Sequence, residues 1–393
     1  MSDSTTATAD FIDLAVPLAP GHALQALRRE RPKIVDATQA SQQAMFGDAV
    51  AGLSVRHRLA VALHCCRLAQ APGLAALYER ALLDGGAPAD HVQAIGTDGV
   101  AAIVSPRLAA LLQFAGTLTR KPLDGDRAAI TALVDAGLTP PDIVALGQLV
   151  AYLSYQIRLV AGLQALAAAG PAPALRSDVP GALAAPPVVN ATPAEPLLIN
   201  GFTSATLGWL PWLPTVDVDT ATPEQLAALD AMNATARQSP YFLLLAHQPE
   251  LLLQRSIAFN AIMFAPGGLS RAERELGATV ESVLNGCVYC TAVHAQRFEQ
   301  LAKRNDVIRQ LFEQPGQAAQ AGTTPRERAI VAFSARLGLQ PQAVAAADVA
   351  ALRSAGLDDR EVLDLVHAVA LFAWANRLML NLGEAVWPAG LKA

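Results

Sequence analysis

Residues 275–294 read ELGATVESVLNGCVYCTAVH, a stretch that predicts one helix, a break and the start of a second helix. Apolar residues recur at helical spacing before the break, and Ser270 with Glu273 forms a capping box that starts the first helix. Asn285-Gly286 then ends this helix, because the dipeptide favours a turn. The sequence therefore predicts two consecutive helices joined by a tight turn.

The second helix carries two thiols and a base. If it begins at the break, Cys287, Cys290 and His294 occupy positions i, i+3 and i+7, so their side chains project from one face. The amides of a helix N-terminus and a nearby imidazole lower the pKa of a cysteine, and the thiolate is the nucleophile. A second thiol one turn away can condense with an oxidised sulfur to form a disulfide. This spacing is typical of a redox-active pair.

Together with Glu275, these residues resemble the motif of the AhpD-like alkylhydroperoxidases of the carboxymuconolactone decarboxylase superfamily. That motif is a glutamate, eleven residues, C-x-x-C, three residues and a histidine, and all four positions match. The resemblance implies that Cys290 attacks peroxide, that Cys287 resolves the product, and that His294 and Glu275 relay protons. The best-known member has a histidine before the second cysteine, where this chain has Tyr289, so a relay through that histidine cannot operate here.

The sequence before the motif is similar to that of peroxidase-related members of the family. It contains SPYF at 239–242, LAH at 245–247 and PE at 249–250. The resemblance implies a thiol-dependent alkyl hydroperoxidase or disulfide reductase that needs neither a metal nor an organic cofactor. Its partners are then a small peroxide and an external dithiol or thiol of lipoyl or thioredoxin type, and it assembles as a homo-oligomer. Two alternatives stay open: a redox-sensing or scaffold protein without turnover, and a lactone decarboxylase that uses acid/base chemistry and needs no C-x-x-C.

The composition argues against several other classes of protein. The chain has 393 residues, of which 52% are hydrophobic and only 16% charged, so it buries large apolar faces. A net charge of −5 without a lysine or arginine cluster disfavours nucleic acid and acidic membrane surfaces as partners. The N-terminus lacks the pattern of a secretory signal, and we expect a cytoplasmic protein.

The sequence contains an internal repeat. Residues 53–78 align with 269–294 at an offset of 216, and residues 105–163 align with 324–382 at an offset of 219. We therefore predict an all-α protein made of two tandem AhpD-like helical domains. The first domain covers 1–169 and the second 222–393.

The first copy lacks the four motif residues. At the offset of 216, Glu275, Cys287, Cys290 and His294 correspond to Leu59, Ala71, Leu74 and Tyr78. Cys65 and Cys66 do not fall on these positions, and adjacent cysteines do not readily close on each other, so we interpret them as buried packing residues. The first domain is expected to act as a scaffold without a site of its own.

A linker rich in proline, alanine and glycine is predicted at 170–221. Its last part contains Trp209 and Trp212 and is too apolar for a free tether, so we expect it to anchor on the folded surface rather than to cover a pocket. The apolar run 362–382 contains several charged or polar residues and predicts a buried helix rather than a membrane span. Helices are expected at 223–237, 240–264, 270–284, 287–303, 325–338, 342–355 and 359–383.

A structural zinc site is an alternative interpretation of the C-x-x-C pair with His294. Zinc needs four ligands, and Glu275 would have to be the fourth because no second C-x-x-C is present. We therefore predict no metal. His247 and His367 lie singly in apolar helices and are interpreted as core residues, outside the site.

Overall fold

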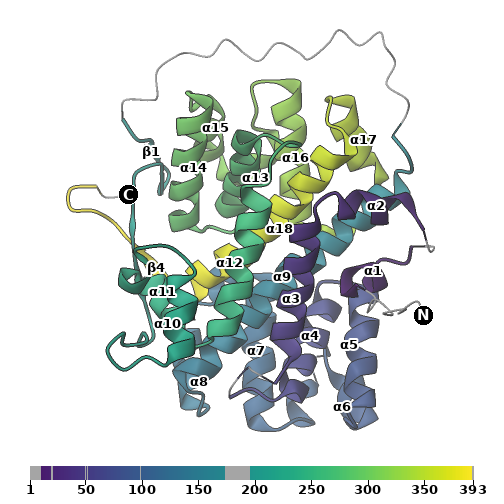
Figure 1. The fold of residues 1–393 in the computed structure, drawn as a ribbon, viewed down its shortest axis with the longest axis vertical. Helices are drawn as coiled ribbons and strands as arrows, with labels where there is room; N and C mark the ends of the chain where they lie inside the picture. The colour runs from purple at the N-terminus through teal and green to yellow at the C-terminus, as the bar shows by residue number, and fades with distance from the viewer. Residues whose placement is uncertain are drawn as a thin grey trace, which may run out of the picture.

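The computed structural model describes residues 10–18, 21–48, 50, 52–97, 99–172 and 195–391, and it confirms the all-α prediction (Figure 1). The first half contains α1 (Phe11–Ala15), α2 (Ala23–Arg29), α3 (Pro32–Phe46), α4 (Val55–Leu68), α5 (Pro72–Asp84), α6 (Ala89–Ala94), α7 (Pro106–Arg120), α8 (Arg127–Asp135) and α9 (Pro140–Ala168). The second half contains α10 (Pro223–Asp230), α11 (Pro240–Leu245), α12 (Pro249–Met263), α13 (Arg271–Leu284), α14 (Val288–Ala302), α15 (Asp306–Glu313), α16 (Pro325–Leu339), α17 (Ala346–Ser354) and α18 (Asp359–Asn381). Short 3-10 helices lie at Val100–Ala102, Pro122–Asp124, Ala236–Gln238, Pro315–Gln320 and Pro341–Ala343.

The internal duplication is visible in the bounds of the helices. Helices α4 and α13 are separated by 216 residues at both ends (55 to 271 and 68 to 284), and α7 and α16 by 219 (106 to 325 and 120 to 339). The structure extends the repeat further towards the N-terminus, where α3 and α12 are separated by 217 residues (32 to 249 and 46 to 263) and α2 and α11 begin with the same separation (23 to 240). We call α2–α9 the N-terminal copy and α11–α18 the C-terminal copy.

The two long helices α9 and α18 form the centre of the molecule, where they lie against each other (Figure 1). Both begin with a capping box, formed by Thr139 with Asp142 and by Asp358 with Glu361. By length and composition each is apolar enough to cross a membrane, but the apolar window of each is entirely buried inside the protein. This burial explains the apolar run that the sequence showed at 362–382.

Two arginines join the copies in the same way. Arg158 of α9 donates to the carbonyl oxygen of Gly338, near the end of α16. Its counterpart Arg377 of α18 donates through Nε to the carbonyl oxygen of Leu118, near the end of α7, at 3.0 Å. Carbonyls in the last turn of a helix have no partner within it, so each arginine satisfies one such group in the other copy. The duplication is therefore present in the contacts as well as in the order of the helices.

A second connection differs between the copies. Arg31, which precedes α3, donates through Nε to Oδ1 of Asp364 at 2.9 Å, and Arg274 donates to Oδ2 of the same carboxylate at 2.8 Å. The counterpart of Arg31 is Gln248, which precedes α12 and donates through Nε2 to the carbonyl oxygen of Pro141 at 3.0 Å. One link between the copies is thus ionic and buried, whereas the other is a neutral hydrogen bond.

Several predicted helix bounds are wrong. The helix expected over 240–264 is two helices, because Pro249 disfavours a helical conformation at Gln248 and starts a new helix there. The helix expected over 223–237 ends at Asp230. Helix α15 was not predicted. The other expected helices agree to within a few residues.

The predicted linker falls partly outside the described residues, which resume at 195 after the gap at 173–194. After the gap, β1 (Leu198–Ile199) pairs with β2 (Phe202–Thr203), and β3 (Gly208–Pro211) pairs antiparallel with β4 (Gly383–Val386). Trp209 of β3 is buried, and its Nε1 donates to the carbonyl oxygen of Met379 at 3.0 Å. This apolar segment is anchored on α18, as expected. The domain boundaries at 169 and 222 stay a prediction.

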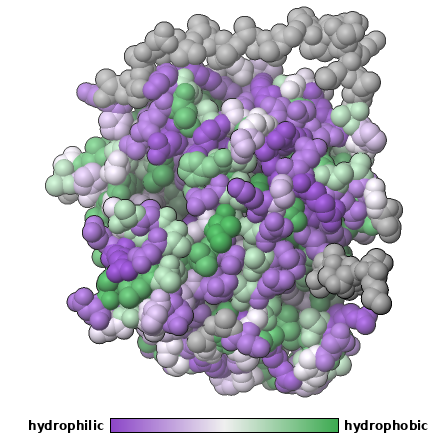
Figure 2. Space-filling view, viewed as in Figure 1, coloured by the Kyte–Doolittle hydropathy of each residue, from purple (hydrophilic) through white to green (hydrophobic). Residues whose placement is uncertain are grey.

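Figure 2 shows hydrophilic and hydrophobic residues interspersed over the visible face. The apolar side chains gather instead along α9 and α18, whose residues are nearly all buried. The site residues lie in helices that pack on this core.

Candidate active site

The turn between α13 and α14 fixes the position of the first cysteine. Gly286 has φ +69°, a conformation that favours glycine, and its amide donates to the carbonyl oxygen of Val283 at 3.0 Å. The amide of Cys287 donates to the carbonyl oxygen of Ser282 at 2.9 Å. The end of α13 is therefore closed by two hydrogen bonds, and Cys287 becomes the N-cap of α14.

The two sulfurs of the C-x-x-C pair are neighbours. Sγ of Cys287 and Sγ of Cys290 lie 2.7 Å apart, and both cysteines are free thiols. The backbone amide of Cys290 donates to Sγ of Cys287 at 3.4 Å. A disulfide bond is about 2.05 Å long, so little movement separates this pair from the bridged form. The cysteines are only 1% and 4% exposed, which keeps the pair away from bulk water.

The environment of Cys290 opposes loss of its proton. Burial raises the pKa of the Cys290 thiol well above its ordinary value, and the adjacent Cys287 raises it further. The positive charge of Arg255 acts in the opposite direction. A buried dithiol releases its second proton with difficulty, because two negative sulfurs repel each other at short distance. A thiolate at Cys290 therefore needs a base to take its proton and a cation to stabilise its charge.

His294 and Glu275 form a hydrogen-bonded pair. Nδ1 of His294 lies 2.5 Å from Oε2 of Glu275, and the imidazole packs edge-on against Phe372 with ring centroids 4.1 Å apart. A carboxylate on Nδ1 holds the proton there and leaves Nε2 as the free base. His294 follows Cys290 by one helical turn, on the same face of α14. The imidazole and the second thiol therefore lie on consecutive turns of one helix face.

Glu275 is ionised in this environment. Burial favours its neutral form, but the hydrogen bond and charge of His294 and the charge of Arg271 outweigh burial and lower the pKa of Glu275. Nε of Arg271 donates to Oε1 of Glu275 at 2.6 Å. The guanidinium of Arg271 also lies over the ring of Phe264, 4.1 Å from its centroid. Arg271 therefore connects the fully buried carboxylate to the surface.

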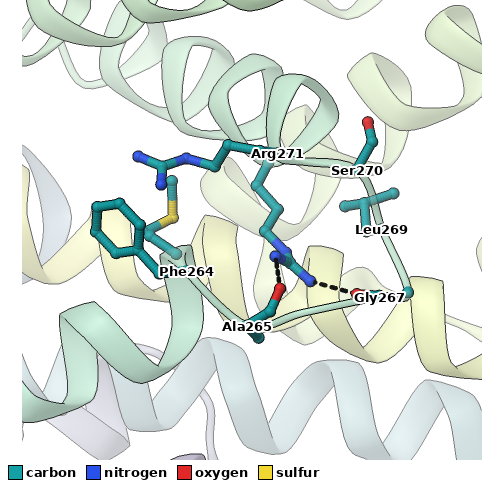
Figure 3. A pocket seen from close by; sticks show the side chains of 9 residues that line it. Phe264, Ala265, Gly267, Leu269, Ser270 and Arg271 are labelled. Carbon is teal, nitrogen blue, oxygen red and sulfur yellow. Dashed lines mark hydrogen bonds between the residues drawn. The ribbon is translucent and has the colours of Figure 1, made fainter.

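A surface cavity of about 260 Å³ lies on the outer side of Arg271. Figure 3 shows Arg271 and Phe264 on one side of it and the loop with Ala265 and Gly267 below, whose carbonyl oxygens accept hydrogen bonds from Arg274. The cavity does not contain the sulfurs. It exposes Arg271, the hydrogen-bond partner of Glu275, to solvent.

The remaining residues near the dithiol were not predicted as site residues. The charge of Arg255 of α12 acts on Cys290, the two cysteines act electrostatically on Tyr241 of α11, and Tyr289 directly precedes Cys290. Among the additional site residues, only Arg271 could have been found from helical spacing, because it lies one turn before Glu275. Arg255 and Tyr241 reach the site through the packing of separate helices, which no local spacing reveals.

The corresponding region of the N-terminal copy is filled. Tyr78 replaces His294, and its hydroxyl donates to Gln42 at 3.2 Å and to Gln156 at 2.5 Å. The rings of Phe11 and Phe46 pack on Tyr78 with centroids 5.4 and 5.1 Å away. Hydrogen bonds and ring contacts to Tyr78 thus fill the position that His294 has in the C-terminal copy.

Metal ligation was the main structural alternative for the motif. Within the part of the chain that the structure describes, no group of three histidine, cysteine, aspartate or glutamate side chains converges as a metal site does. His294 directs Nδ1 to Glu275, and the cysteines face each other. The described residues therefore offer pairs rather than a tetrahedral ligand set.

A comparison with protein-family models matches part of the chain. Residues 249–336 match the model of the carboxymuconolactone decarboxylase family, and this range includes Glu275, Cys287, Cys290 and His294. This part of the chain is similar to the carboxymuconolactone decarboxylase family. A search for curated relatives found no match.

Two solved structures resemble part of the chain. One is an uncharacterized peroxidase-related protein with an alkylhydroperoxidase AhpD core from Ralstonia eutropha JMP134, at 25% identity and a TM-score of 0.36, over 42% of this chain and 85% of that one. The other is an uncharacterized peroxidase-related protein from Silicibacter sp. TM1040, at 25% identity and a TM-score of 0.36, over 42% of this chain and 87% of that one.

Proposed function

We propose that this protein is a dithiol hydroperoxidase that reduces peroxides with the C-x-x-C pair of its C-terminal copy. The observation that carries the proposal is the combination of two sulfurs 2.7 Å apart with a histidine whose Nδ1 is held by a buried carboxylate. The superfamily of residues 249–336 includes peroxidase-related and decarboxylase-type proteins. The dithiol favours the peroxidase, because acid/base decarboxylation needs no second sulfur.

The proposed reaction has two steps. His294 takes the proton of Cys290, and the thiolate attacks the outer peroxide oxygen, so that a sulfur–oxygen bond forms while the oxygen–oxygen bond breaks. The leaving alkoxide takes the proton back from His294 and departs as an alcohol. Cys287 then attacks the sulfenic sulfur, a disulfide forms, and its thiol proton leaves with the hydroxide as water. An external dithiol of lipoyl or thioredoxin type reduces the disulfide.

Peroxide consumption driven by dihydrolipoamide tests this proposal. Cys290→Ser is expected to abolish turnover. Cys287→Ser is expected to permit one oxidation without forming the internal disulfide. Cys65→Ser, in the N-terminal copy, is the matched control and keeps full turnover. Full turnover by Cys290→Ser would rule out the proposed nucleophile.

A redox sensor is the second candidate, and the burial of both sulfurs favours it. A sensor undergoes the same oxidation once and is not regenerated rapidly. Mass mapping after peroxide treatment would find the Cys287–Cys290 disulfide in both cases. Continuous peroxide consumption by dihydrolipoamide separates the two, because only an enzyme turns over.

A further inference from the structure

Arg255 differs from the other buried arginines of the described residues. Each of the others donates hydrogen bonds to carboxylates or to backbone carbonyl oxygens; they are Arg28, Arg31, Arg58, Arg158, Arg274 and Arg377. Arg255 is 8% exposed, its Nε has no hydrogen-bond partner, and among the described residues it forms no ion pair. Nε of Arg28, Arg158 and Arg274 is likewise without a partner, but those arginines have oxygen acceptors for their other nitrogens. A buried cation without an anionic or carbonyl partner is costly, which makes this position a candidate for binding a negative charge.

The surroundings of Arg255 connect it to the residues of the candidate site. Its guanidinium carbon lies 5.5 Å from the ring centroid of Tyr241 and 5.3 Å from that of Phe259, so two aromatic rings hold it. Phe259 packs edge-on against Phe372, and Phe372 in turn packs against His294. The charge of Arg255 acts on both Cys290 and Tyr241. Arg255 and His294 therefore pack on one aromatic wall, formed by Phe259 and Phe372.

Tyr241 supplies a second polar group without a partner. Its hydroxyl oxygen is buried and forms no hydrogen bond. Burial, offset by Arg255 and reinforced by the two cysteines and Tyr289, raises the pKa of Tyr241 to about 12, so the hydroxyl keeps its proton and can donate it. Tyr241 also packs edge-on against Trp209, with ring centroids 5.6 Å apart. Arg255 and the hydroxyl of Tyr241 are thus two neighbouring donors without acceptors.

The N-terminal copy provides an internal comparison. With the separation of 217 residues that relates α3 to α12 and α2 to α11, Arg255 corresponds to Thr38 and Tyr241 to Leu24. Thr38 is hydrogen-bonded to Tyr155 at 2.8 Å and has no charge. The copy that lacks the dithiol therefore also lacks both unpartnered donors, although it keeps the structural arginines Arg58 and Arg158.

We propose that Arg255 is the counter-ion of the Cys290 thiolate and that, together with the hydroxyl of Tyr241, it binds the two peroxide oxygens during the attack. This inference rests on the proposed function. In the step described above, the guanidinium stabilises the negative charge first on sulfur and then on the leaving alkoxide, and the hydroxyl of Tyr241 orients the peroxide. The thiol proton still goes to His294 and returns to the alkoxide.

The test measures the thiolate separately from peroxide turnover. In a Cys287→Ser background, the ultraviolet absorbance of the thiolate is followed against pH. Arg255→Met is expected to move the midpoint upward by about one pH unit, which corresponds to about tenfold less thiolate below it. Arg255→Lys keeps the charge and is expected to restore most of the midpoint. Arg297→Met, an exposed arginine on α14, is the matched control and leaves the midpoint unchanged.

The second measurement is the rate of oxidation by cumene hydroperoxide, with both cysteines present. Arg255→Met is expected to lower this rate at least tenfold, and Arg255→Lys to lower it less. Tyr241→Phe is expected to lower the rate severalfold. An unchanged midpoint and an unchanged rate in folded Arg255→Met would overturn the inference. If Arg255→Met does not fold, Arg255→Lys and Tyr241→Phe decide it, because wild-type rates in both would refute peroxide binding by these groups.

The two measurements distinguish the possible failures. If the protein is not a peroxidase, the oxidation rate is negligible in every variant, but the thiolate midpoint still reports whether Arg255 is the counter-ion. If the function is right and the inference wrong, wild-type oxidation is fast and independent of Arg255.

Discussion

The two copies have the same helices in the same order, yet only the C-terminal copy carries Glu275, Cys287, Cys290 and His294. In the C-terminal copy, the space between α13 and α14 holds Glu275 and His294 in a hydrogen-bonded pair. In the N-terminal copy, the same space holds Leu59 and Tyr78, and the tyrosine hydroxyl is satisfied by two glutamines. The comparison shows that the fold accommodates either the Glu275–His294 pair or Leu59 with Tyr78. The helical framework therefore does not require the pair.

The largest expected effect comes from giving the C-terminal copy the residue of its counterpart. Glu275→Leu is expected to lower the second-order rate constant for peroxide at least a hundredfold, because His294 loses the carboxylate that orients it and balances its charge. Steady-state kinetics with cumene hydroperoxide measure this. The exposed Glu250→Gln is the control. A rate within threefold of wild type in Glu275→Leu would show that the relay is dispensable.

The second effect concerns the links between the copies. Arg31→Met is expected to cost about 3 kcal/mol of unfolding free energy, since it removes one of the two arginines that neutralise buried Asp364. Its counterpart Gln248→Ala removes neutral hydrogen bonding and is expected to cost about 1 kcal/mol. Urea unfolding of both variants measures the difference. Equal losses would contradict an energetic role for the ionic link.

The framework could be read from the sequence, whereas the site could be read only in part. Helix order and the repeat follow from apolar spacing and from caps such as Ser270, which are local signals. The boundary between α11 and α12 at Gln248 was missed because the apolar pattern continues across it. Arg255 and Tyr241 could not be found, because they meet the cysteines only when α11 and α12 pack beside α14. Arg31 and Asp364 are far apart in sequence, and their pairing likewise arises from packing.

A third prediction uses pH to separate the carboxylate from its surroundings. The pKa of Glu275 is lowered in the folded protein, so its ionised form contributes stability above the ordinary pKa of a glutamate, and that contribution is lost as pH falls through the lowered folded value. Glu275→Gln is therefore expected to be less stable than wild type by about 1–3 kcal/mol near neutral pH. The difference should shrink in acid. Urea unfolding at several pH values measures it, and a constant difference would contradict the ionised state.

The smallest effect is expected for the cysteines of the N-terminal copy. Burial raises the pKa of Cys65 to about 11 and that of Cys66 well above its ordinary value, so both stay protonated. Peroxide treatment should therefore leave them as thiols, as mass mapping after denaturation and alkylation can show, and Cys65→Ala should cost only about 1 kcal/mol of stability. Oxidation of Cys65 or Cys66 at the rate of the C-terminal pair would show that burial alone does not protect a thiol here. In that case His294 and Arg255 would not be what makes the C-terminal pair reactive.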